Sequence, residues 1–213
     1  MKNKQAYELE INLLNKLKDH LSAENMIKDL NLSQEERKSM SHYQFLTDKN
    51  YIVLLNTGET DEDTADCTEV INYIKEKGIT CVDFCGKIEM ELAQLPPEER
   101  KEFMEELGIE ESARKRFIKE SYKMLNLISF ITVGKDEVRA WTIESGTIAQ
   151  KAAGKIHSDL ERGFIRAETV SYEDFKEKCN GDMNKAREQG LLRQEGKEYI
   201  VKDGDIINIK FNV

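Results

Sequence analysis

Two short apolar runs separated by a helical segment and a glycine constrain the fold of this chain most. The first run, Tyr51–Asn56, is continuously apolar up to its last residue, as in a strand buried on both faces of a sheet. Helix-compatible residues follow from about Thr64 to Lys77, Gly78 ends that helix, and Ile79–Phe84 forms a second buried strand. Strand, helix, glycine and strand make a βαβ unit of a parallel sheet. Because two strands do not form a stable doubly wound sheet, we expect this unit to be half of a domain.

Helices are predicted on both sides of this unit. Ser33 and Glu36 have the spacing of a capping box, so a short helix begins there. Two further helices are expected to start near Pro97 and near Glu111. In the first segment the leucines recur at helical spacing, at Leu9, Leu13, Leu14, Leu17 and Leu21. The first 46 residues are therefore predicted to form a helical hairpin.

The last third of the chain has a different pattern. From Leu127 onward short strands alternate with turns, and one helix, Ile148–Ala153, follows the first strand pair. The turns are expected at Gly134-Lys135, Gly163, Gln194–Lys197 and Asp203-Gly204. Strand, strand, helix and further strands fit a β-grasp, or ubiquitin-like, module. The predicted fold class is thus a mixture of α+β and α/β: a helical segment, a partial parallel α/β half-domain and a C-terminal β-grasp domain.

Charge is unevenly distributed over the 213 residues, whose net charge is −9. Residues 129–213 hold 14 basic and 15 acidic residues, a net of −1, so the first 128 residues carry the remaining −8. An acidic surface repels phosphate backbones, which disfavours nonspecific nucleic-acid binding by the first part. Because no apolar run reaches the ~18 residues of a membrane span, we expect a cytoplasmic protein without a membrane partner.

The cysteines predict neither a disulfide scaffold nor a zinc site. Cys81 and Cys85 are four residues apart, but neither a Cys-x-x-Cys motif nor paired histidines accompany them. Buried, reduced thiols are the expected state of Cys81, Cys85, Cys67 and Cys179. No metal site is predicted.

The phosphate-binding motif of nucleotide hydrolases, G-x-x-x-x-G-K-[ST], does not occur in this sequence. Gly86-Lys87 is the nearest approach to it, but Gly78 stands at the wrong distance and Ile88 replaces the hydroxyl residue. Without that loop the chain has no evident means to hold a triphosphate and its metal. We therefore expect no hydrolysis of ATP or GTP by this chain alone, and predict no catalytic residue. His157 and Asp159 have no nucleophile or metal partner nearby in the sequence.

Several phrases of the last third carry a family resemblance. They are Ile128–Gly134, Asp136–Ile143, Ala152–Asp159, Gly163–Glu168, Glu198–Ile207 and Phe211–Val213. Together they closely resemble the C-terminal TGS domain of the YchF/Obg-like ATPases, a branch of the Obg-related P-loop NTPases. The resemblance implies three parts: residues 1–46 as the remainder of a coiled-coil insertion, 47–127 as the second half of the nucleotide-binding domain, and 128–213 as the TGS domain.

The resemblance implies that this chain performs only part of the family's function. Proteins of this family are ATPases that prefer ATP over GTP, use Mg²⁺ and associate with ribosomes and translation. This chain would supply base recognition and TGS docking, but not hydrolysis. A stand-alone, non-enzymatic TGS adaptor that binds RNA, the ribosome or a protein is the alternative. Self-association through the incomplete sheet is also expected.

The resemblance also assigns a base site. Asn56-Thr57-Gly58-Glu59 follows a buried strand, where α/β folds bind ligands, and matches the family's Asn-x-x-Glu motif. Asn56 would hydrogen-bond the base, Thr57 and Gly58 would line it, and Glu59 ends the motif. Cys85 and Gly86 would form the last base-contacting loop, with Cys85 in place of the usual Ser. From the residues alone, an ordinary turn and a glycine that opens a helix are equally consistent.

RNA or ribosome contact is the remaining expectation for the last third. The basic candidates are Arg139, Lys151, Lys155, Arg162 and Arg166. Trp141 and Phe164 are possible stacking groups, although aromatic residues on strands more often pack in a core. The sequence departs from the family at Glu144, where a basic residue is usual, and at Gln150, where proline is usual, which weakens attraction to phosphate.

Overall fold

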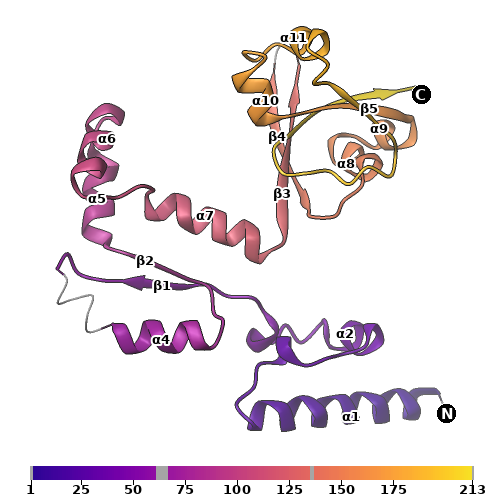
Figure 1. Ribbon diagram of the computed structural model, residues 1–213. Coiled ribbons are helices and arrows are strands. Elements are labelled where there is room, and N and C mark those ends of the chain that lie inside the picture. Colours follow the sequence, from indigo (N-terminus) through magenta and orange to yellow (C-terminus); the bar gives the residue numbers. More distant parts are fainter. Residues whose placement is uncertain (1, 61–66, 135–136, 213) are drawn as a thin grey trace. The chain divides into compact units, whose positions relative to one another are not determined.

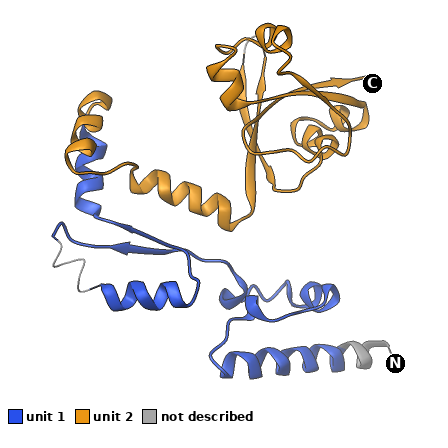
Figure 2. Ribbon diagram, viewed as in Figure 1, with its two compact units in different colours: residues 1–95 blue, residues 96–213 orange. Residues whose placement is uncertain are grey.

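A computed structural model describes residues 2–60, 67–134 and 137–212. The expected helix start at Thr64 and the turn residue Lys135 lie outside these ranges, as do Asp136 and Val213 of the family phrases. The chain forms two compact units, residues 1–95 and 96–213 (Figure 2). The division falls inside the range 47–127 predicted as one domain. Each unit is described by itself below.

Unit 1 begins with the predicted helical segment (Figure 1). Its elements are α1 (Lys2–Ser22), η1 (Ile27–Asp29), α2 (Gln34–Met40) and η2 (Leu46–Asp48). Leu13 and Leu17 of α1 are buried against Ile27, Leu32 and Met40. The capping box is confirmed: the Ser33 hydroxyl accepts from Glu36 N, and the Glu36 carboxylate accepts from Ser33 N. The apolar side of α1 and a capped second helix therefore produce a small helical core.

The predicted βαβ unit follows. It consists of β1 (Val53–Asn56), α4 (Thr68–Glu76) and β2 (Cys81–Phe84), and the two strands pair in parallel from Val53↔Cys81 to Asn56↔Phe84. Gly78 ends the helical segment at a φ of 63°, a left-handed conformation that glycine adopts without strain. The next helix, α5 (Gly86–Gln94), begins directly after β2.

One prediction about β1 is wrong. A strand buried on both faces was expected, but the Leu54 side chain is 51% exposed and residues of β1 alternate between half-buried and exposed. The physical reason is that β1 and β2 form a two-stranded sheet, and nothing in the described residues covers Leu54. The apolar residues typical of a fully covered strand thus lie in a strand that is only partly covered.

Unit 2 starts with two helices and continues as a five-stranded sheet. The helices are α6 (Pro97–Glu106) and α7 (Ala113–Met124), both near their predicted starts. The strands are β3 (Leu127–Val133), β4 (Val138–Glu144), β5 (Phe164–Ser171), β6 (Arg193–Glu195) and β7 (Asp205–Phe211). Their order is β4-β3-β7-β5-β6, with β7 parallel to β3 and antiparallel to β5. The mixed α/β class is therefore confirmed.

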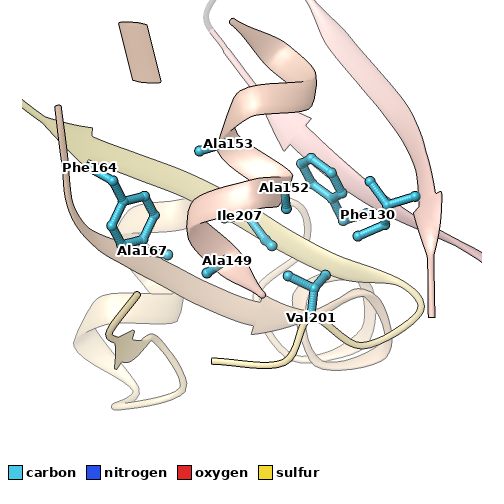
Figure 3. Close-up of a cluster of buried hydrophobic side chains, with 9 residues drawn as sticks. Phe130, Ala149, Ala152, Ala153, Phe164, Ala167, Val201 and Ile207 are labelled. Atoms are coloured by element: carbon cyan, nitrogen blue, oxygen red, sulfur yellow. The ribbon is translucent and has the colours of Figure 1, made fainter. Parts of the chain in front are cut away.

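One face of this sheet is covered by the predicted helix after the first strand pair. The helix α8 spans Ala149–Ile156, and the short α9 (Ser158–Arg162) follows it. Figure 3 shows the alanines of α8 against the sheet, among Phe130, Phe164 and Ile207. Small alanine side chains let the helix lie close to the strands, so bulky side chains of the sheet fill the space.

The opposite face is covered by two helices that were not predicted from the sequence. They are α10 (Tyr172–Glu177) and α11 (Met183–Glu188), where only strands and turns were expected. Phe175 and Ala186 of these helices pack with Val170 and Ile206 of the sheet. The expectation of a single helix failed because both helices are too short for a clear apolar period. Their N-cap residues are the sequence feature that indicates them: the Ser171 side chain accepts from Asp174 N, and the Asp182 side chain accepts from Asn184 N.

Across the residues that the structure describes, no helix combines the length and apolarity needed to cross a membrane.

Candidate functional site

The carboxyl ends of β1 and β2 bring the predicted base-site residues together. Asn56 and Phe84 are register partners, so the segments after them begin side by side. Thr57 joins the two segments, because its backbone N–H donates to Phe84 O at 2.9 Å and its hydroxyl to the same oxygen at 3.3 Å. Ligands of open α/β sheets bind at this end of the strands.

A side-chain bridge links Asn56 to the second loop. The Gly86 backbone N–H donates to Asn56 Oδ1 at 2.9 Å. A Cβ on residue 86 would lie 3.0 Å from the same Oδ1, so glycine permits this approach. The Asn56 side chain is exposed, and its Oδ1 accepts the Gly86 N–H. Among the contacts of the described residues, its Nδ2 amino group remains as the donor for a ligand.

A second bridge was not predicted. Lys87 Nζ lies 2.8 Å from Glu59 Oε1, and both side chains are solvent-exposed. The hydrogen bond with Glu59, and then its charge, raise the pKa of Lys87. From the sequence, Lys87 belongs to an imperfect phosphate motif and to the predicted last base-contacting loop, Phe84–Lys87, with no partner assigned to it. The parallel arrangement of the two strands is the signal that would have paired it with Glu59, since residues just beyond such strands meet at one edge.

Gly58 and Cys85 contribute less than the resemblance implied. Gly58 is exposed in the loop after β1. Cys85 is half-buried at the N-cap of α5 and makes no side-chain capping bond, while its carbonyl accepts from Glu89 N at 3.0 Å. Its thiol is free. Cys85 thus acts here through its backbone.

The resulting loop pair presents an amide, a carboxylate and an ammonium group at one sheet edge. These groups can donate and accept hydrogen bonds. Within residues 2–60, 67–134 and 137–212, no group of three or more metal-ligating side chains is present.

The basic candidates of unit 2 divide into paired and unpaired groups. Lys151 lies 2.6 Å from Glu161, and Arg162 forms an ion pair with Asp159. Charges neutralised in this way attract phosphate weakly. Arg166 is exposed on β5, opposite Lys210 in the register.

Arg139 and Lys155 line one groove. This groove has a volume of about 550 Å³ and lies along β4, with Trp141 and Glu144 also in its wall. The Arg139 guanidinium is 4.2 Å from the Trp141 ring centre, and Trp141 Nε1 donates to Thr132 Oγ1 at 2.9 Å. Trp141 is therefore half-buried and already stacked, while Phe164 is buried in the core.

Comparisons with known proteins agree with this architecture. The family model YchF-GTPase_C, described as a protein of unknown function (DUF933), matches residues 127–212. A protein of Escherichia coli O157:H7 named ribosome-binding ATPase YchF is 44% identical over 205 residues, 96% of this chain and 56% of that protein. A protein of the same name from Bacillus subtilis (strain 168) is 42% identical over 208 residues, 96% of this chain and 56% of that protein.

Two solved structures have the same arrangement. The YchF GTPase of Schizosaccharomyces pombe matches with a TM-score of 0.79 and 31% identity, over 97% of this chain and 55% of that one. A GTP binding protein from Pyrococcus horikoshii OT3 matches with a TM-score of 0.55 and 16% identity, over 85% of this chain and 51% of that one, which shows the fold alone.

The fold and these matches define part of a protein of mixed α/β architecture. Within that class the chain belongs to the YchF family, as a partial YchF-type protein. It spans 56% of the length of the curated relatives from Escherichia coli and Bacillus subtilis.

Proposed function

We propose that this chain supplies the base-recognition and docking parts of a ribosome-associated ATPase that prefers ATP over GTP. The observation that carries the proposal is the pair of bridges, Asn56–Gly86 and Glu59–Lys87, at the ligand-binding edge of the parallel strands. The ribosome-binding names of the curated relatives support the docking part. Phosphate and Mg²⁺ would be held by parts outside this sequence, which contains no phosphate-binding loop.

The proposed domain organisation follows the predicted boundaries. Residues 1–46 are the coiled-coil remnant, 47–127 the half-domain of the nucleotide fold, and 128–213 a TGS domain of the β-grasp type. In support of the last assignment, a strand pair is followed by a helix across one sheet face, and the final strand β7 runs parallel to β3. A cytoplasmic location is proposed as well.

Base preference would arise from the donors and acceptors of the two loops. Glu59 offers only acceptors, whereas Lys87 and the Asn56 amino group offer donors. Adenine presents a donor amino group beside an acceptor nitrogen, so a neighbouring carboxylate and ammonium complement it. A carboxylate alone favours the adjacent N–H groups of guanine. Lys87 would thus shift the preference toward adenine.

Titration of the chain with adenosine and with guanosine, followed by amide NMR, tests this proposal. We expect adenosine to shift the Gly86 amide and the Asn56 side-chain amide at millimolar concentrations. Lys87→Met should reduce the ratio of adenosine to guanosine affinity, whereas Lys101→Met, which removes only an exposed pair with Glu105, should leave it unchanged. Equal spectra with and without either nucleoside would refute the base site.

A stand-alone adaptor remains the second candidate function. The free groove cations Arg139 and Lys155 favour it, because both lack an ion-pair partner among the described residues. RNA binding by unit 2 belongs to this candidate. Ribosome pelleting separates the two: base-site variants should leave an adaptor's co-sedimentation unchanged, while groove variants should reduce it.

A further inference from the structure

The outer edge of β4 offers a row of unpaired backbone groups. In an antiparallel pair, residues that exchange hydrogen bonds alternate with residues whose N–H and C=O point away. Ser145 N bonds Asn126 O and Gly134 N bonds Glu137 O, at the two ends of the β3–β4 register. Because Glu137 and Ser145 bond to the residues that flank β3, and every second residue between them bonds in the same direction, the backbone hydrogen bonds of Arg139, Trp141 and Ile143 are directed toward β3. The N–H and C=O groups of Val138, Ala140 and Thr142 therefore point outward.

Two of the usual protections of an edge strand, a bulge and a proline, are missing from this row in the described part of the chain. The β3–β4 register runs without a bulge from Leu127↔Glu144 to Val133↔Val138, and the strand contains no proline. Val138 is 68% exposed, and Ala140 is exposed as well. β4 is also the last strand on its side of the sheet. A long, regular and uncovered edge is a template for pairing with another strand.

The groove beside this edge adds a charge preference. Arg139 and Lys155 line it, and neither forms an ion pair within the described residues, unlike Lys151 and Arg162. Stacking on Trp141 fixes the Arg139 guanidinium over the groove wall. Glu144, the last residue of β4, is an acidic group at the same wall. Acidic side chains are therefore favoured near Arg139 and disfavoured near Glu144.

We propose that the β4 edge binds an extended segment of a partner protein, which adds as a sixth strand with acidic side chains facing Arg139 and Lys155. A polypeptide matches the alternating donors and acceptors of Val138, Ala140 and Thr142, so backbone bonds supply affinity and side chains supply selectivity. Ribonucleotides provide no such alternating row. The ring face that would stack a base is occupied by Arg139. The observations thus favour protein over RNA.

A capped heptapeptide of alternating glutamate and valine is the probe for the first test. We expect the amides of Val138, Ala140 and Thr142 to shift and to slow their hydrogen exchange when it binds the full chain, while those of Arg139, Trp141 and Ile143 change little. The same peptide with lysine in place of glutamate should bind at least roughly tenfold more weakly. Amide shifts that do not alternate between these two sets of residues would overturn the proposal of strand addition.

Variants separate the backbone and charge contributions. Ala140→Pro removes an outward N–H without touching the bonds to β3, so it should abolish peptide binding, whereas Ala140→Val should retain it. Arg139→Gln and Lys155→Gln should each weaken binding by roughly fivefold. If Ala140→Pro does not fold, a peptide N-methylated at alternate residues provides the same test on the unaltered chain. Binding of a twelve-nucleotide oligouridine that survives Ala140→Pro, with no peptide binding, would overturn the proposal in favour of RNA.

Discussion

At the scale of single residues, Gly86 and Asn56 define the candidate base site by contact. Gly86→Ala would place a Cβ 3.0 Å from Asn56 Oδ1, so the amide must move. The lost hydrogen bond, worth about 1 kcal/mol, opposes the gain of about 1 kcal/mol from replacing glycine in a helix. We therefore expect almost unchanged stability in urea unfolding but clearly weaker adenosine binding. Gly196→Ala, with nothing within 4 Å of its Cβ, is the control that should change neither.

A second residue-scale prediction concerns Glu168, which is buried at 4% exposure among basic and amide groups. Burial alone would raise the pKa of this carboxyl, but bonds from Gln194 and Lys210 and the charges of Lys210 and Arg187 outweigh it, so the pKa is lowered from 4.5. A lowered folded pKa stabilises the protein above 4.5 and loses that stabilisation as the pH falls below it. Urea unfolding between pH 6 and pH 3 should show this loss.

Glu168→Gln is the matching variant for the pH series. It should destabilise the chain at pH 6 by about 1–3 kcal/mol, since the exposed Arg187 and the half-exposed Lys210 lose a buried charged partner. Below pH 4.5, the free energy of unfolding of this variant should also fall less steeply with pH than that of the unaltered chain. An identical pH dependence in both proteins would mean that Glu168 contributes nothing to the acid sensitivity.

At the scale of elements, the close approach of α9 and β7 depends on Gly163. A Cβ at this position would collide with the backbone carbonyl of Asn212, whose N–H donates to Gly163 O at 2.9 Å. Backbone cannot rotate away as a side chain can, so Gly163→Ala should destabilise unit 2 by about 1–3 kcal/mol in chemical unfolding. A loss no greater than that of Gly196→Ala would contradict this packing account.

Some elements of this fold were predictable from the sequence and others were not. Both strands of the βαβ unit, the capped helix after Ser33 and the α8 helix were predictable, because apolar runs, a capping box and strand-pair spacing are local signals. The helices α10 and α11 were missed since their six-residue lengths leave only a cap as a signal. The Glu59–Lys87 contact joins residues from two loops, so only the strand pairing reveals it.

At the scale of the whole molecule, the two-stranded sheet of unit 1 leaves an apolar surface uncovered. Leu54 is 51% exposed, and β1 and β2 each have one neighbouring strand. We expect concentration-dependent self-association of the chain in light scattering, reduced by Leu54→Lys because a charge opposes burial. Leu46→Lys, at a side chain 80% exposed outside this sheet, is the control. A monomer at all concentrations would contradict the prediction.

We propose that the chain recognises a base without holding phosphates, and calorimetric titration with adenosine, AMP and ATP in the presence of Mg²⁺ is the decisive experiment. We expect weak affinities that do not rise as phosphates are added, because the sequence contains no phosphate-binding loop. Submicromolar ATP binding, or affinity that grows steeply from adenosine to ATP, would contradict it.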